Sequence, residues 1–193
     1  MKNLGNLKYF LGIEVLRSEG GIFLRQKKYI LDILVETGLI DCKPADTPIL
    51  VNHGLQISEE AKLADQGKYQ RLVEKLIYLS HTRPDIAYAV GVVSQFMHRP
   101  QKDHFEAALR IVRYLKGTVE HGIMFRKNKH RGVYGFTDAN WASNPIDRKS
   151  TAGYFTFVEG NLVTWRSKKQ KVVALSSAEA EFRGIRSGLI EIL

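Results

Sequence analysis

Val133-Tyr-Gly-Phe-Thr-Asp138 is the stretch that decides the fold of the last third of this 193-residue chain. Its aromatic residues stand at every second position, which is typical of a half-buried strand. Two similar segments follow at Tyr154–Val158 and Leu162–Trp165, with Gly160 and Asn161 between them as a tight turn. The simplest arrangement of these three segments is an antiparallel three-stranded meander. After it, the residues from Leu175 onward predict a final helix that runs to the last residue.

Residues 1–125 have a different pattern, which is mostly helical. Apolar residues at helical spacing predict one helix that Gly38 closes, a second over Tyr69–Ile77, a third that Pro84 opens, and a fourth that ends at Gly117. A β-hairpin with its turn at residues 19–21 precedes them, and 41–65 is predicted to be a linker or long surface loop. The sequence therefore predicts an α/β chain with a boundary in the basic turn 126–131.

Composition narrows the class of protein. The chain carries 29 Lys and Arg against 20 Asp and Glu, a net charge of +9, and the excess begins after residue 65. A basic surface of this kind attracts polyanions, and nucleic acid is the first to consider. The single cysteine, Cys42, can form no internal disulfide, and no signal peptide or membrane span is recognisable. We expect an intracellular protein, in the cytoplasm or the nucleus, with no membrane partner.

Basic side chains on the fourth helix and in the following turn are the candidates for contact with a phosphate backbone. A solvated helix face would explain the same charges. The candidates are Arg99, Lys102, Arg110, Arg113, Lys127, Lys129 and Arg131.

Asp138 and two glutamates are the candidate catalytic groups. Strand alternation places Asp138 on the face that carries Tyr134 and Phe136, although from local sequence the strand more simply ends at Asp138 and the acid begins a turn. Glu179 matches the capping box that Ser176 would start, and it flanks the apolar stripe of Phe182, Ile185 and Leu189 on one side, with Glu181 on the other. Helical spacing does not separate the two glutamates.

Strand and helix carboxylates in a basic domain are what two-metal phosphodiester chemistry requires, and their oxygens suit Mg²⁺. Two acids rarely suffice to hold two such ions, and downstream of Glu181 only Glu191 remains. The candidate site is therefore incomplete in this sequence.

Five motifs give the chain a resemblance to a known family. It resembles the C-terminal part of the reverse transcriptase of copia-type retrotransposon Pol polyproteins, continuing into their ribonuclease H domain. The resemblance covers essentially the whole chain. The motifs are Leu7-Lys-Tyr-Phe-Leu-Gly-Ile-Glu14, Thr82-Arg-Pro-Asp-Ile-Ala-Tyr-Ala-Val90, Arg113-Tyr-Leu-Lys-Gly-Thr118, Thr137-Asp-Ala-Asn-Trp-Ala142 and Ala174-Leu-Ser-Ser-Ala-Glu-Ala-Glu-Phe182.

The resemblance implies a fold and a function. It implies a helical thumb and connection segment of reverse transcriptase over residues 1–125, then the first half of a ribonuclease H-like domain over 130–193. Asp138 corresponds to the first metal-binding Asp of that domain and Glu179 to its helix Glu, with Glu181 as the alternative, so Mg²⁺ and an RNA–DNA hybrid or other duplex are the implied cofactor and partner. The remainder of the Pol polyprotein would be a further partner.

The polymerase aspartates and the later ribonuclease H acids of the family fall outside this sequence. We therefore expect the polypeptide by itself to have lost both reverse transcription and RNA cleavage. Two other functions stay open from sequence alone: a non-catalytic nucleic-acid-binding module, and an inert relic.

Overall fold

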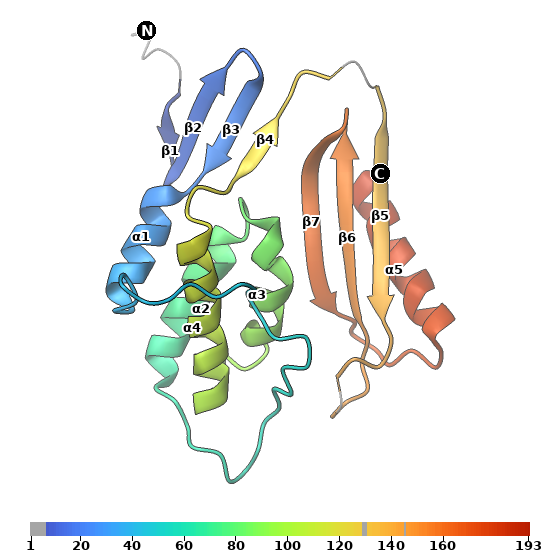
Figure 1. Ribbon diagram of the computed structural model, residues 1–193. Helices are drawn as coiled ribbons and strands as arrows, with labels where there is room; N and C mark the ends of the chain where they lie inside the picture. The colour runs from blue at the N-terminus through green and yellow to red at the C-terminus, as the bar shows by residue number, and fades with distance from the viewer. Residues whose placement is uncertain (1–6, 129–130, 145) are drawn as a thin grey trace, which may run out of the picture. The chain divides into compact units, whose positions relative to one another are not determined.

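The computed structural model describes residues 7–128, 131–144 and 146–193. The chain forms two compact units, Met1–Arg126 and Lys127–Leu193 (Figure 1). In the parts described it contains five α-helices and two antiparallel sheets. The two units are described separately below.

The first unit begins with the predicted hairpin. Strands β2 (Ile13–Ser18) and β3 (Gly21–Arg25) pair antiparallel, with Ser18 opposite Gly21, which confirms the hairpin and its turn. Strand β1 (Tyr9–Phe10) extends the sheet on one side, and β4 (Ile123–Phe125) pairs with β3 on the other. The pairing of β4, almost a hundred residues downstream, was not predicted.

The four helices of this unit enclose its core. They are α1 (Lys27–Glu36), α2 (Gln66–Leu79), α3 (Ala87–Ser94) and α4 (Lys102–Gly117), and a 3₁₀ turn at Pro84–Ile86 leads into α3. Gly38 has a φ of 69°, so it ends α1 in the left-handed conformation as predicted. The fully buried core residues come from all four helices: Ile30, Ile33, Tyr69, Val73, Leu76, Leu79, Ala89, Val93, Ala108, Ile111, Val112 and Leu115.

One residue of the predicted stripe on α2 is misplaced. Ile77 is 38% exposed, whereas Tyr69, Val73 and Leu76 are fully buried. Because the helix has 3.6 residues per turn, position 77 lies beyond the edge of the helix face that packs on the core.

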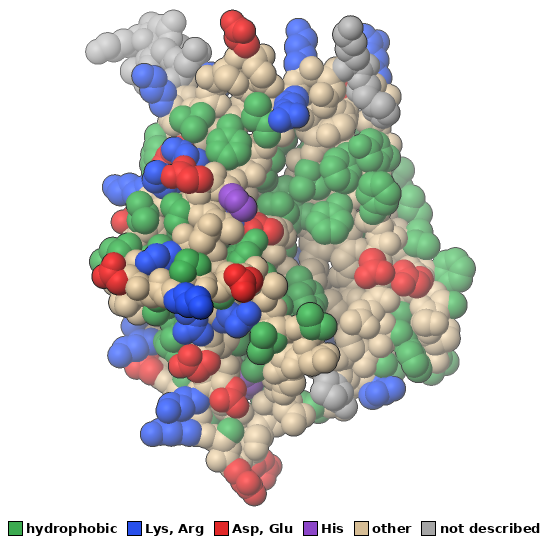
Figure 2. Space-filling view, viewed as in Figure 1, with side chains coloured by type: hydrophobic (Ala, Val, Ile, Leu, Met, Phe, Trp, Pro, Cys, Tyr) green, Lys and Arg blue, Asp and Glu red, His purple; other side chains and the backbone are tan. Residues whose placement is uncertain are grey.

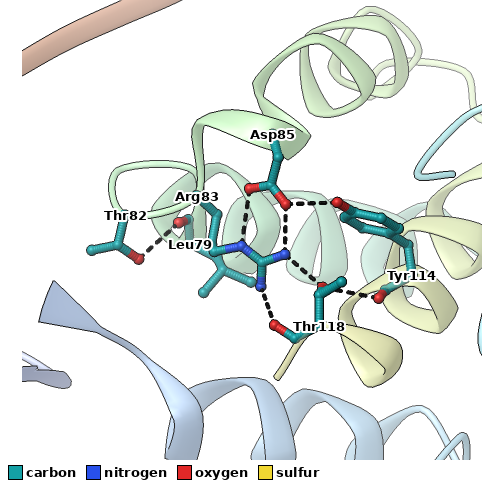
Figure 3. A network of polar contacts seen from close by, with 6 residues as sticks. All are labelled: Leu79, Thr82, Arg83, Asp85, Tyr114 and Thr118. Carbon is teal, nitrogen blue, oxygen red and sulfur yellow. Dashed lines mark hydrogen bonds and ion pairs between the residues drawn. The ribbon is translucent and has the colours of Figure 1, made fainter. Parts of the chain in front are cut away.

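A buried arginine joins the start of α3 to the end of α4 (Figure 3). Arg83 is 1% exposed, and its guanidinium donates to both carboxylate oxygens of Asp85, at 2.9 and 2.6 Å. It also donates to the carbonyl oxygen and the hydroxyl of Thr118, at 3.0 and 2.6 Å. The Tyr114 hydroxyl donates to Asp85 at 2.9 Å. These bonds satisfy a cation that would otherwise be costly to bury.

The segment 41–65 is a surface loop held against α4, not a free linker. Arg110 donates to the carbonyl oxygen and the hydroxyl of Thr47, at 3.1 and 3.0 Å. The buried His104 ring accepts from the backbone N–H of Gln101 and contacts the carbonyl oxygen of Gln56 at 3.2 Å. Desolvation by burial lowers the pKa of the His104 imidazole.

The second unit contains the predicted meander. Strands β5 (Val133–Asn140), β6 (Thr151–Val158) and β7 (Asn161–Lys169) pair antiparallel in that order. Helix α5 (Ser177–Ile192) packs on β5 and β6. In Figure 1 the helix lies on one face of the sheet and leaves the other face to the viewer.

Small residues form the packing face of α5, so the predicted apolar stripe was wrong. Ala180, Gly184 and Gly188 are buried, whereas Phe182 is 71% exposed and Ile185 and Leu189 are also exposed. The Cα of a glycine can approach a sheet more closely than any larger residue allows. Close approach therefore decided the orientation of this helix, and hydropathy did not.

Replacing Gly188 by Ala should destabilise this unit. A Cβ at this position would lie 2.5 Å from Cγ2 of Thr137, a stiff β-branched side chain on β5. We expect a loss of about 1–3 kcal/mol in the free energy of unfolding, measured by urea denaturation. The matched control is Gly184→Ala, whose Cβ would meet its nearest neighbour at 3.6 Å and which should be neutral or stabilising. Equal losses for the two variants would contradict the packing described here.

Candidate active site

Asp138 lies within β5, not at its end. The strand continues to Asn140, so the simpler interpretation of Asp138 as the first residue of a turn was wrong. Asp138 is opposite Gly153 of β6 and is exposed. Gly135, Thr137 and Ala139 lie on the face of β5 that packs against α5. Successive residues of a strand point to opposite faces, so Asp138 lies on the other face, with Tyr134 and Phe136.

Glu181 is the glutamate that reaches this strand. One of its carboxylate oxygens accepts a hydrogen bond of 3.2 Å from the backbone N–H of Ala139, the residue after Asp138. Position 181 is one residue from the packing residue Ala180, on the flank of α5 that lies toward β5. The structure thus brings the Glu181 carboxylate to the backbone of the residue that follows Asp138.

Glu179 is bound at the start of α5. The hydroxyl of Ser176 accepts from the backbone N–H of Glu179 at 3.1 Å, which confirms Ser176 as the N-cap. The Glu179 carboxylate accepts from the backbone N–H of Leu175 at 2.7 Å and pairs with Arg183 at 2.6 Å. These interactions hold the pKa of Glu179 below its ordinary value, the bond from Leu175 most of all. Its carboxylate is therefore used locally, in stabilising the helix start.

Asp138 and Glu181 fit Mg²⁺ in the chemistry of their donors. Both supply carboxylate oxygens, and Mg²⁺ is commonly bound by one or two carboxylates while it keeps several waters. No group of three His, Cys, Asp or Glu side chains in the described residues is arranged to hold a metal ion.

The candidate nucleic-acid contacts are divided between the two units. Arg99 and Lys102 are exposed in the first unit, where Arg110 already donates to Thr47 and Arg113 is half-buried. Lys127 and Arg131 are exposed in the second unit. Lys129 lies outside the described residues.

An aromatic surface covers the face of the second sheet opposite α5. Tyr134 and Phe157 stack at 5.1 Å, and Phe136 meets both edge to face. Phe136 is 61% and Phe155 46% exposed. Figure 2 shows hydrophobic side chains gathered over these strands.

Similar proteins place the chain in a class first, that of transposable-element proteins. It is 44% identical to a retrovirus-related Pol polyprotein from transposon RE1 of Arabidopsis thaliana, over 96% of this chain and 13% of that protein. It is 38% identical to one from transposon TNT 1-94 of Nicotiana tabacum, over 94% of this chain and 14% of that protein. An uncharacterized mitochondrial protein of Arabidopsis thaliana is 42% identical, over 96% of this chain and 77% of that protein.

The chain belongs to the family of retrovirus-related Pol polyproteins of copia-type transposons. It spans about 13% of the length of the first two of these Pol polyproteins. No protein-family model and no solved structure matches it. None of the helices in the described residues is long and apolar enough to cross a membrane.

Proposed function

We propose that the chain is the junction between reverse transcriptase and ribonuclease H in a copia-type Pol polyprotein. The first unit would supply the helical thumb and connection segment, and the second would supply the first half of a ribonuclease H-like domain. The reaction served by the second unit is hydrolysis of the RNA strand of an RNA–DNA hybrid. The observation that carries the proposal is the hydrogen bond from Ala139 to Glu181, which holds a helix carboxylate at the backbone of the residue that follows Asp138.

In this proposal Asp138 and Glu181 are the residues that hold Mg²⁺. The ion, when bound, supplies a Lewis acid for a phosphodiester oxygen and lowers the pKa of bound water. The backbone N–H of Ala139 orients Glu181, so this carboxylate needs little rearrangement to act as a ligand. Glu179 has a different task, because its bonds to Leu175 and Arg183 commit it to the helix start.

The 193 residues alone are expected to cleave poorly. Two carboxylates hold Mg²⁺ weakly, and the described residues bring no third ligand to them. Further acids would come from the sequence that follows the matching region in the Pol relatives. A non-catalytic nucleic-acid-binding module is the second candidate, and the net charge of +9 favours it.

The test compares the chain with an extended chain, which adds the segment that follows the matching region in the RE1 polyprotein. With Mg²⁺ and a labelled RNA–DNA hybrid, only the extended chain should cleave RNA. Asp138→Asn in the extended chain should abolish cleavage, because it removes a ligand charge at constant size. Cleavage that survives this substitution contradicts the assignment of Asp138. No cleavage by the extended chain at all favours the binding module.

A further inference from the structure

A basic groove runs along α5 on the side of β7. It has a volume of about 650 Å³, and its floor is Ala152, Gly153 and Tyr154 of β6. Arg166, Lys168 and Lys169 of β7 and Lys171 just after it form one wall. Arg183 and Arg186 of α5 stand on the other, with Ser187, Ile190 and Glu191.

The sequence pattern explains why these side chains meet. Arg166 is opposite Tyr154 and Lys168 is opposite Ala152, and directly opposed residues of antiparallel strands share a face. A Cβ at Gly188 would meet Tyr154 and one at Gly184 would meet Ala152, so that face is the one against which α5 packs. On α5, positions 183 and 187 are one turn apart on the flank toward β7. Strand alternation thus places the side chains of β7 along one wall of the groove, and helical spacing places those of α5 along the other.

The charge of the groove is strongly positive after its ion pairs are counted. Lys169 pairs with Asp147 at 2.8 Å, and Arg183 pairs with Glu179. Glu191 is the acid that lines the groove, and its carboxylate accepts a hydrogen bond of 2.8 Å from the Tyr154 hydroxyl. Among the described residues none forms an ion pair with Lys168, Lys171 or Arg186. Three cations are therefore available to a ligand.

This groove is distinct from the carboxylate pair. Glu181 lies on the flank of α5 toward β5, where it bonds Ala139, whereas Arg183 and Ile190 lie on the opposite flank. The face that packs on the sheet, Ala180, Gly184 and Gly188, separates them. A ligand in the groove would not need Asp138 or Glu181.

We infer that the groove between α5 and β7 is a second nucleic-acid site, which binds the phosphodiester backbone of a strand without reading its sequence. Arg166 and Lys168 are two residues apart on β7, about 6.6 Å along the strand, and so present a row of cations along a backbone. Tyr154 is the aromatic residue in the lining and is buried, so the groove offers no ring on which a base could stack. Charge complementarity and this lining favour backbone phosphates over bases.

The test measures the binding of a fluorescein-labelled RNA–DNA hybrid to the full chain at several salt concentrations. Lys168→Glu with Arg186→Glu should weaken binding about tenfold or more at ~50 mM salt, and should make the slope of log K against log salt shallower by about 1.5–2 units. The matched control is Lys68→Glu with Arg71→Glu, exposed residues of α2 that give the same change of net charge. The control should weaken binding less than about threefold.

Three results would overturn the inference. The first is an equal loss of affinity in the two double variants, which would show that net charge alone matters. The second is displacement of the hybrid by poly-glutamate as effectively as by unlabelled hybrid, which would indicate an acidic protein partner. The third is a tenfold loss of affinity on Asp138→Asn, which would place the bound strand at the carboxylates. Failure of the extended chain to cleave RNA would leave these binding results unchanged, so the two proposals fail separately.

Discussion

Glu181→Gln should lower the rate of RNA cleavage by the extended chain about 10³-fold, whereas Glu179→Gln should change it less than about threefold. Removing a ligand charge from a metal site costs several kcal/mol of transition-state stabilisation, and each 1.36 kcal/mol is a factor of ten in rate. Glu181 accepts from the backbone N–H of Ala139, the residue after Asp138, whereas Glu179 is bonded to Leu175 and Arg183. Single-turnover cleavage of a labelled hybrid at saturating Mg²⁺ measures both variants.

Thermal unfolding supplies the control for this pair of variants. Glu179→Gln should lower the melting temperature, because it weakens the bonds that begin α5. Glu181→Gln keeps an oxygen that can accept from Ala139 and should unfold close to the parent temperature. The reverse outcome, with cleavage lost on Glu179→Gln and kept on Glu181→Gln, would show that Glu179 is the metal ligand of α5.

Arg83→Met should destabilise the first unit by about 3 kcal/mol, as urea denaturation would measure. Met keeps much of the apolar volume but removes the guanidinium donors from Asp85 and from the carbonyl oxygen of Thr118. Breaking a buried ion pair by removing one partner costs about 3–5 kcal/mol, and the side chain of Asp85 is 32% exposed, which favours the lower figure. Tyr114→Phe is the control, since it removes one hydrogen bond to Asp85 and should cost about 1 kcal/mol.

The pH dependence of unfolding tests the same network. Burial by itself would raise the pKa of Asp85, but the hydrogen bond and the charge of Arg83 outweigh it and hold this pKa below the ordinary value of 3.8. A carboxylate with a depressed pKa stabilises the fold above its unfolded pKa and loses that contribution as the pH falls through its folded pKa. The parent should therefore lose stability below about pH 4, and Arg83→Met should lose less over the same range. Parallel curves for the two proteins would contradict the ion pair.

Local patterns predicted those parts of the fold that local chemistry determines. The hairpin at residues 19–21, the helix end at Gly38 and the meander all depend on turn residues and on alternation between neighbours in sequence. The pairing of β4 with β3 was missed because three residues carry too little pattern to reveal a partner so far away.

The carboxylates show a different limit of prediction. Both glutamates fit helical spacing, and the choice between them depends on which face of α5 packs on the sheet. Hydropathy ranks Phe182 above Gly184, so it selected the wrong face. The repeat of Ala180, Gly184 and Gly188 at intervals of four was the signal in the sequence for the packing face, because small residues at this spacing allow a helix to approach closely.

Strand β5 has one consequence for handling the protein. In the described part of the chain it hydrogen-bonds to β6 along one edge, and its other edge carries the N–H of Ala139 that Glu181 occupies. The remaining groups of that edge, beside the exposed Val133 and Phe136, are a template on which another extended chain can add. We expect intermolecular β-sheet to form from this edge at high protein concentration, and an added strand that caps the edge to prevent this association.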